Sequence, residues 1–373
     1  VETIAKELKK AGKNAGFIAS AGVLNEDAIT MQMFASEVVK TRNIDSTASL
    51  YGDLDTLISE GADIDSADLF VAVDINPSQW DRVLPAIDAI VRKRVNSGAA
   101  KLITINSAET KLSSIAAVSL IENEAEALRS LAKALIDKGL EADKKLSAAV
   151  LDASVSEAVE KAAELYSAAK NPVILASPAI YRAAANISLL KGAAVSVPYE
   201  SNAKGVVMMG ASSDGKSYKE MVSGGVSALF VMGEIPLSER PKADFVVVSG
   251  SYMTELAKQA DVVLPAAAYL ETDGTIVDYL GRLKNVNKAI EFEGAKSHRK
   301  IIAEIAKAMG TDFKEVKESD AKKLAKIKIK PSFSSFEKVD FSSNAGEIME
   351  AVNVSVINGS RLLWLKEALV CSK

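Results

Sequence analysis

The chain has 373 residues, of which 48% are hydrophobic and 25% charged, a composition typical of folded globular proteins rather than disordered ones. Its 45 basic and 49 acidic residues give a net charge of −4, and with an aromatic content of only 5% this argues against a nucleic-acid partner. One cysteine and one histidine exclude an internal disulfide, a cysteine-bound iron–sulfur cluster and a zinc cluster, so we expect no metal site in this chain. No apolar run approaches the ~18 residues of a membrane span, so direct membrane insertion is not expected.

Short β-branched runs alternate along the chain with longer stretches of alanine, leucine, lysine and glutamate at helical spacing. Strands are predicted at 16–20, 69–74, 101–106, 172–176, 193–197, 228–232, 245–249 and 261–264. Amphipathic helices are predicted at 25–41, 80–96, 122–138, 155–169 and 252–259. This alternation is typical of βαβ units, and so many strands exceed one small sheet. The sequence therefore predicts an α/β protein with two doubly wound, mostly parallel-sheet, Rossmann-like domains.

A polar break and a change of composition suggest how the chain is divided. The break at 139–146 separates two groups of predicted strands. The C-terminal part is lysine-rich and then Ser/Phe-rich, with too few apolar residues to close a core, so it is predicted to be an extended, partly ordered arm. The expected domains are interleaved in sequence: residues 1–50 with 147–310, residues 51–146, and the arm 311–373.

In open α/β sheets, ligands bind beyond the carboxyl ends of the strands. One predicted strand exits through Asn76-Pro77 and another through Gly233 and Pro236, which suggests a duplicated half-site, although each alone is an ordinary strand-to-helix turn. No Gly-x-Gly-x-x-Gly motif or P-loop follows a strand, which argues against an NAD fingerprint and against an ATPase. His298, surrounded by lysine and arginine, is interpreted as a surface histidine at a polar helix start.

The most specific stretch of the sequence lies between Asp261 and Asn287. Its glycines allow close approach of the backbone to a ligand or to a packing neighbour. The stretch resembles the segment near the end of the central domains of molybdopterin oxidoreductases. The matching residues are Glu271, Gly274, Thr275, Gly281 and Arg282, whereas Asp278, Leu280 and Lys284 replace the usual asparagine, glutamate and glutamine.

Other turns carry the same resemblance, which extends to about Gly310. Asn202 and Gly205, followed by Met209, Gly210 and Ala211, look like the Asn-x-x-Gly and Met-Gly-Ala loop of formate dehydrogenases. Asn76-Pro77 and Gly233 with Pro236 are similar to the turns that flank the pterin dinucleotides, with Asp74 and Ile235 as departures.

The segment from Asn43 to Gly52 is similar to the stretch that leads to the metal ligand in this family. In formate dehydrogenases that ligand is cysteine or selenocysteine followed by histidine, whereas here the positions read Tyr51 and Gly52, and the usual arginine is Ser49. A phenol is a hard donor that cannot replace a thiolate or selenolate without strong activation, and glycine cannot relay protons. The family's Pro-Gly-Thr-Asp loop reads Glu122-Asn123-Glu124-Ala125, and the C-terminal barrel domain is not recognisable.

These departures imply a catalytic position that has been lost, with Tyr51 and Gly52 as its vestige and no catalytic residue. The vestigial cofactor cleft would comprise Asn76, Pro77, Asn202, Gly205, Gly233, Gly274, Thr275 and Arg282. The family's molybdopterin guanine dinucleotide is not expected to bind.

The resemblance then implies a cofactor-free scaffold like that in the large peripheral-arm subunit of respiratory complex I, an NADH:quinone oxidoreductase. Its partners would be iron–sulfur and NADH-binding subunits, with the clusters in an upstream region or in a partner. Such a scaffold would lie on the cytoplasmic or matrix side, peripheral to the inner membrane through the complex.

Two alternatives remain open. One is an active molybdenum or tungsten bis-pterin oxidoreductase of formate dehydrogenase type, with Tyr51 or a water on the metal. The other is a small-molecule-binding module that uses the vacated cleft, with Asn76, Asn202, Gly233 and Arg282 as polar contacts. The same residues could also serve only in turns and helix caps, which need no ligand.

Overall fold

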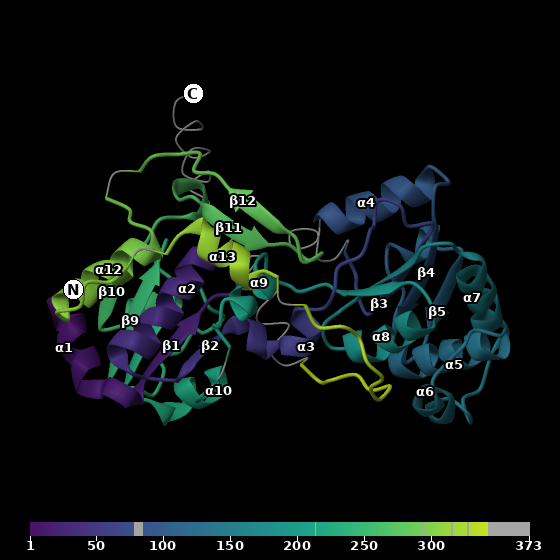
Figure 1. Cartoon of the computed structure of the whole chain (residues 1–373), viewed down its shortest axis with the longest axis horizontal. Helices are drawn as coiled ribbons and strands as arrows, with labels where there is room; N and C mark the ends of the chain where they lie inside the picture. Colours follow the sequence, from purple (N-terminus) through teal and green to yellow (C-terminus); the bar gives the residue numbers. More distant parts are fainter. Residues whose placement is uncertain (78–84, 213, 293, 315, 327, 342–373) are drawn as a thin grey trace.

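The computed structural model describes residues 1–77, 85–212, 214–292, 294–314, 316–326 and 328–341. The strands are β1 (Ala15–Ala19), β2 (Ile44–Ser46), β3 (Leu69–Val73), β4 (Lys101–Asn106), β5 (Val118–Ile121), β6 (Pro172–Ala176), β7 (Ala193–Ser196), β8 (Ala228–Met232), β9 (Phe245–Gly250), β10 (Val262–Pro265), β11 (Gly274–Val277) and β12 (Leu283–Val286). They form two lobes, each built on a five-stranded parallel sheet (Figure 1). The first lobe has the order β10-β9-β8-β1-β2 and the second the order β5-β4-β3-β6-β7. This confirms the predicted doubly wound α/β fold.

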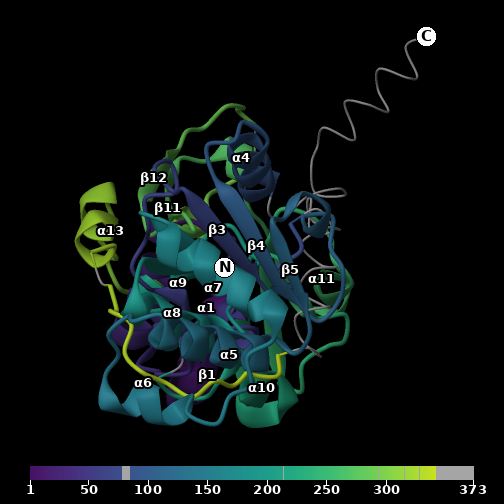
Figure 2. The ribbon, with the colours of Figure 1, turned by 90° about the vertical axis from the view of Figure 1, so that its right-hand side faces the viewer.

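Helices cover both faces of the second sheet. The helices of the chain are α1 (Glu2–Ala11), α2 (Asn25–Met33), α3 (Leu54–Leu57), α4 (Pro85–Asn96), α5 (Glu124–Asp137), α6 (Lys144–Ala149), α7 (Glu157–Ala168), α8 (Tyr181–Leu190), α9 (Ala203–Met208), α10 (Tyr218–Glu220), α11 (Glu255–Gln259), α12 (His298–Ala308) and α13 (Glu318–Leu324). Leu69, Val71 and Val73 of β3 pack toward α5, α7 and α8, while Phe70 and Ala72 pack toward α4 (Figure 2). A strand buried on both faces needs an unbroken apolar run, which is the pattern that predicted it.

The first lobe has its core around β1, whose five residues are all buried. The Phe17 ring packs edge-on against Phe34, with ring centroids 5.8 Å apart, and lies at the same distance from Phe230 on the neighbouring strand β8. Helix α12 contacts both α1 and α2 on this lobe. The central strand is therefore fixed on both faces, which positions the loop that follows it.

The antiparallel hairpin β11–β12 extends from the first lobe, and its tip points toward the second lobe and contacts it (Figure 1). At the tip, Leu280 is only 4% exposed and packs in the core of the second lobe, with Tyr279 beside it. A Cβ atom added at Gly61 would lie 1.9 Å from the Leu280 carbonyl oxygen, so this approach requires glycine. Leu280, which departs from the family's glutamate, therefore has a packing role between the lobes.

All eight predicted strands are present, with bounds within one residue of those expected. The strands that the sequence analysis missed are β2, β5, β11 and β12, which have only three or four residues and show no clear period. The helix expected at 25–41 ends as α2 at Met33 and continues as a π-helical turn over Phe34–Val39. Part of the helix expected at 80–96 lies outside the described residues.

Sheet membership differs from the expected division of the chain. Strands β6 and β7 fall in the range 147–310, which was assigned to the first unit, yet β6 pairs with β3 and β7 with β6 in the second sheet. The polar break at 139–146 consists of the loop after α5 and the first residues of α6, and Leu140 packs on the second core. The chain therefore returns to the first lobe only after β7. The pairing of the strands, and not the polarity of a surface loop, determines which residues belong to which lobe.

The expected arm is extended as far as the structure describes it. It begins with α13 on the first lobe and then runs across to the second lobe, as the yellow segment in Figure 1 shows. On the way Ile329 forms a bridge with Ser59, and its N–H donates to the Ile58 carbonyl oxygen at 3.1 Å. No helix in the described part of the chain is long and apolar enough to cross a bilayer.

Candidate functional site

The crevice of the first sheet lies at the carboxyl end of β1. Its neighbours β2 and β8 lie on opposite sides of it, so the strand order reverses at this point. The Glu200 carboxyl lies in this crevice and accepts hydrogen bonds from the Thr47 hydroxyl at 2.7 and 2.9 Å and from Ser20 at 3.4 Å. Thr47 in turn accepts from the Ala21 N–H at 2.8 Å. Burial raises the pKa of Glu200 to about 7, because the charged form loses water that these few donors only partly replace.

Tyr51, the expected vestige of the metal ligand, is fully buried beside this carboxyl. Its ring packs edge-on against Tyr199, with centroids 5.1 Å apart. Its hydroxyl lies beside the Glu200 carboxyl, and burial together with this neighbour raises the pKa of Tyr51 well above the usual value. A Cβ atom at Gly52 would lie 2.9 Å from the Leu57 side chain. The position therefore holds a neutral, packed phenol.

A second group of predicted residues meets where α2, α9 and β11 converge. The Asn202 amide donates to the Val23 carbonyl oxygen at 2.6 Å and to Asn25 at 3.0 Å, and it accepts from the Val277 N–H at 2.7 Å. Asn25 is fully buried at the start of α2 and makes no helix-cap hydrogen bond, because its side chain is engaged in this network. A Cβ atom at Gly205 would lie 2.0 Å from the Asn202 side-chain oxygen.

Thr275 connects this network to a buried carboxylate. Its N–H donates to Glu26 at 2.8 Å, its hydroxyl donates to the other Glu26 oxygen at 2.7 Å, and the same hydroxyl accepts from Asn25 at 3.0 Å. A Cβ atom at the neighbouring Gly274 would lie 2.5 Å from the Glu26 carboxylate. The structure thus brings Asn202, Gly205, Gly274 and Thr275 together, but it engages their polar groups with each other and with α2.

The remaining predicted site residues lie elsewhere. Gly233, with φ of 80°, ends β8 beside Ser20 in the first crevice. Asn76 and the buried Pro77 follow β3 on the second lobe. Arg282 is half exposed, and its Nε donates to Asp278 within the hairpin turn at 2.8 Å.

Two buried titratable residues were misjudged or missed. His298 was interpreted as a surface residue, but it is 9% exposed and its Nδ1 lies 2.9 Å from the Ser249 hydroxyl, because α12 packs its first turn into the lobe. Burial lowers the pKa of His298 to about 4, so the ring is neutral at physiological pH.

Lys204 is fully buried with Nζ 3.2 Å from the Ser59 hydroxyl, and burial lowers its pKa to about 7. Nothing in the sequence around Lys204 separates it from an ordinary surface lysine.

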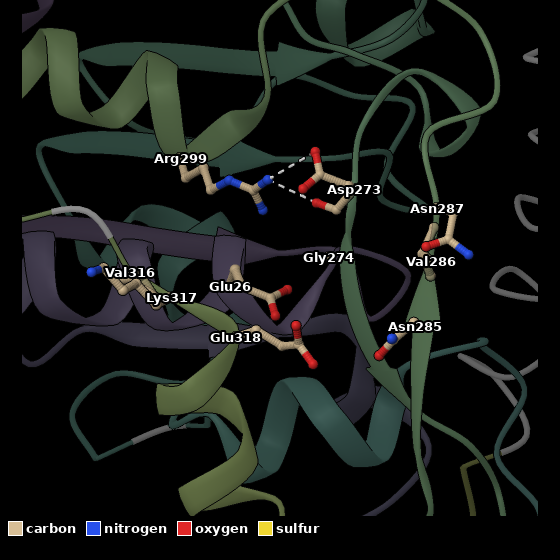
Figure 3. Close-up of a pocket in the computed structure, with 10 residues that line it drawn as sticks. All are labelled: Glu26, Asp273, Gly274, Asn285, Val286, Asn287, Arg299, Val316, Lys317 and Glu318. Atoms are coloured by element: carbon tan, nitrogen blue, oxygen red, sulfur yellow. Dashed lines mark hydrogen bonds and ion pairs between the residues drawn. The ribbon is translucent and has the colours of Figure 1, made fainter.

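A cavity of about 350 Å³ lies beside this buried network (Figure 3). Its walls come from α2, the β11–β12 hairpin, α12 and the start of the arm. The charged side chains that line it include Glu26, Asp273, Glu318 and Arg299. Arg299 points toward Asp273 and donates to its carbonyl oxygen at 2.7 Å. The cavity is polar and of mixed charge, and a small polar molecule would fit it.

A family model described as molybdopterin oxidoreductase matches residues 1–308, most of the chain. The chain belongs to this family. The alpha subunit of the F420-dependent formate dehydrogenase 1 of Methanococcus maripaludis is 35% identical over 96 residues, which are 23% of this chain and 14% of that protein. The match therefore spans only a small part of that relative.

Two solved structures share the fold at low sequence identity. Acetylene hydratase from Pelobacter acetylenicus has a TM-score of 0.57 and 16% identity, with 83% of this chain and 58% of that chain covered. A chain of the formyltransferase/hydrolase complex from Methylorubrum extorquens, in complex with methylofuran, has a TM-score of 0.57 and 13% identity, with 83% and 95% covered. At this identity the likeness shows the fold alone.

The family implies a pterin-held metal, and the residues at position 51 do not fit one. Tyr51 supplies no sulfur or selenium, and its raised pKa keeps the phenol protonated, whereas a metal ligand must be deprotonated. Among the described residues, no group of three or more histidine, cysteine, aspartate or glutamate side chains could hold a metal ion. Asn202 and Thr275, which the sequence resemblance places in a cofactor cleft, are engaged in hydrogen bonds within the chain.

Proposed function

We propose that this chain is a non-catalytic structural component of a molybdopterin-type oxidoreductase assembly. The observation that carries the proposal is the state of position 51, where a neutral phenol is buried against Tyr199 and beside Glu200. A buried tyrosine at this point fills volume and leaves no open coordination position. A scaffold needs a rigid interior of this kind, whereas a metal enzyme needs a coordination position on the metal that substrate or water can occupy.

The polar interior of the first lobe supports the same proposal. Asn202 uses its amide in three hydrogen bonds, and Glu26 accepts two from Thr275. A cofactor that needed these donors would have to break several buried hydrogen bonds, each costing about 1–3 kcal/mol if left unsatisfied. The cleft residues therefore stabilise the junction of α2, α9 and β11.

Within this proposal, we expect the assembly to be an NADH:quinone oxidoreductase of the complex I type. The basis is the sequence resemblance, in which iron–sulfur and NADH-binding subunits surround a cofactor-free domain of this fold. The single cysteine means that any cluster would be carried by a partner or by an upstream region. The Methanococcus relative is itself named as a subunit, which agrees with a role beside other proteins.

A second candidate is an active molybdenum or tungsten enzyme of formate dehydrogenase type. The identity of the Methanococcus relative favours it, since that protein is a formate dehydrogenase subunit. Under this candidate, metal binding would have to move Tyr51 away from Tyr199 and deprotonate it against the neighbouring Glu200. A third candidate, a small-molecule-binding module, is favoured only by the cavity beside Glu26 and Gly274.

Co-purification from the natural host tests the proposal. The protein is isolated through an affinity tag after mild cross-linking, and its partners are identified by mass spectrometry, with an unrelated tagged protein of similar size as control. The scaffold proposal expects stoichiometric iron–sulfur and NADH-binding subunits and no formate oxidation that depends on this chain. Formate-dependent dye reduction that disappears in Tyr51→Phe would support the second candidate instead.

A further inference from the structure

The crevice of the second sheet lies between β3 and β6, the central strands from which the chain winds outward in opposite directions. Asp74 follows β3 with φ of 52°, a conformation that non-glycine residues rarely adopt. The Ser177 hydroxyl at the end of β6 donates to Asp74 at 2.5 Å. The crevice where a sheet of this kind binds its ligands therefore contains a fixed carboxylate.

A second carboxylate lies at the same edge. Glu124 is the first residue of α5, and the side chain of Asn123 caps this helix. The Glu124 carboxylate accepts from the Ser107 N–H at 2.7 Å, and its side chain is only 4% exposed. The start of a long helix attracts an anion, and here the chain's own carboxylate takes that place.

The C-terminal arm supplies the counter-ion. The Lys338 ammonium lies 2.7 Å from Asp74 and 3.3 Å from Glu124, although these residues are 264 and 214 positions away in the sequence. Burial alone would lower the pKa of Lys338, but the two carboxylates outweigh this and raise it, so the ammonium stays charged.

Further contacts hold the arm on the second lobe. The Asn186 side chain donates to the Ser334 carbonyl oxygen at 2.8 Å and accepts from the Ser334 N–H at 3.0 Å. The Val339 N–H donates to the Ala179 carbonyl oxygen at 2.9 Å, just beyond β6. Phe333 and Phe336 pack against the core of the lobe. The arm is therefore held on the second lobe both before and after Lys338, which fixes the position of the ammonium group.

We propose that the crevice between β3 and β6 is a binding site for a primary ammonium group and that segment 333–341 of the arm is its built-in occupant, with Lys338 as the ligand. The two carboxylates of Asp74 and Glu124 face the Lys338 ammonium together. With two carboxylates at its edge, the crevice favours a cation over an anion. This inference stands whether or not position 51 ever carries a metal.

Amide hydrogen exchange of the whole chain tests the proposal, read by mass spectrometry at the peptides containing Ser334 and Val339. In Lys338→Ala we expect exchange of these amides to accelerate about two- to fivefold, since a partly exposed, charge-assisted contact is lost. Lys330→Ala, in an exposed part of the same arm, is the matched control and should leave the exchange unchanged. Unchanged exchange in Lys338→Ala would overturn the proposal.

A double-mutant cycle separates the contact from general destabilisation. Glu124→Gln removes the charge but keeps an oxygen for the Ser107 N–H. Since both variants remove the same interaction, the double variant should exchange little faster than Lys338→Ala alone. If the two effects multiply instead, the residues are not coupled and the proposal fails.

Selectivity is tested with inorganic pyrophosphate, an anion that resembles the phosphates bound at such crevices. At millimolar concentration and matched ionic strength against chloride, pyrophosphate should release the arm no more than chloride does. Specific release by pyrophosphate would show that the crevice selects anions and would overturn the proposal.

Discussion

Both lobes are built on a doubly wound parallel sheet, although the strand order differs, and they close the carboxyl ends of their central strands in different ways. In the first lobe, Ser20, Thr47, Glu200 and Tyr51 fill the crevice from within, and all are buried. In the second lobe, the crevice is closed from outside, by a lysine of the arm whose side chain is 37% exposed. A doubly wound sheet can therefore fill its crevice either with packed side chains of its own lobe or with an ion pair to a distant segment of the chain.

Changing the residues that fill the two crevices should lower the free energy of unfolding by different amounts. Buried side chains in the first crevice are desolvated and tightly packed, so changing them creates cavities or clashes. The ion pair in the second crevice is partly solvated, so its contribution is screened by water and salt.

Tyr51→Ala should lower the free energy of unfolding by about 4 kcal/mol, because it removes a fully buried ring that packs on Tyr199. Tyr51→Phe should cost less than about 1 kcal/mol, because it keeps the ring and removes only the hydroxyl beside Glu200, a carboxyl that retains its donors Thr47 and Ser20. Urea denaturation of both variants measures the difference. Equal losses would mean that the hydroxyl matters as much as the ring, and the packing role of Tyr51 would be wrong.

Gly205→Ala should cost about 3 kcal/mol, since its Cβ atom would lie 2.0 Å from the Asn202 oxygen and 2.2 Å from that of Asn25. Gly22→Ala is the matched control in the same lobe. Its Cβ atom would come no closer than 3.5 Å to Ser20, so a change within about 0.5 kcal/mol is expected. Thermal unfolding of both variants measures the contrast, and a tolerated alanine at 205 would show that the network around Asn202 is loose.

Glu200 should make the stability of the first lobe depend on pH. Its pKa is about 4.5 as an unperturbed group and about 7 in the folded chain, so the folded state holds a proton that the unfolded state releases between these values. Stability should therefore fall as pH rises through this window, by about 2 kcal/mol relative to Glu200→Gln.

Urea denaturation at several pH values from 4.5 to 8 measures this effect, with the exposed Glu109→Gln as control. The difference between the chain and Glu200→Gln should change only within the window, while Glu109→Gln should follow the unmodified chain. A difference that stays constant with pH would show that Glu200 is ionised throughout.

Lys338→Ala should lower the free energy of unfolding by less than about 1 kcal/mol, because the ammonium is partly exposed. The effect should shrink further in high salt. Chemical denaturation followed by a probe on the second lobe measures it. A loss as large as that of Tyr51→Ala would remove the energetic difference between the lobes.

Much of the fold could be predicted from the sequence, because buried parallel strands such as β3 and β6 are unbroken apolar runs. The division between lobes could not, since pairing of β6 with β3 depends on contacts far apart in sequence. Tyr51 was noticed through a family pattern, but its packing on Tyr199 needed the structure. Lys338 had no local signal at all, since its partners Asp74 and Glu124 meet it only in the folded chain.

In the proposed scaffold, position 51 is a packed interior position and not a metal ligand. Elemental analysis of the protein isolated from its natural host, with Tyr51→Phe prepared in parallel, tests it most directly. We predict no molybdenum or tungsten above background in either preparation. One metal atom per chain in the unmodified protein, lost in Tyr51→Phe, would contradict the account.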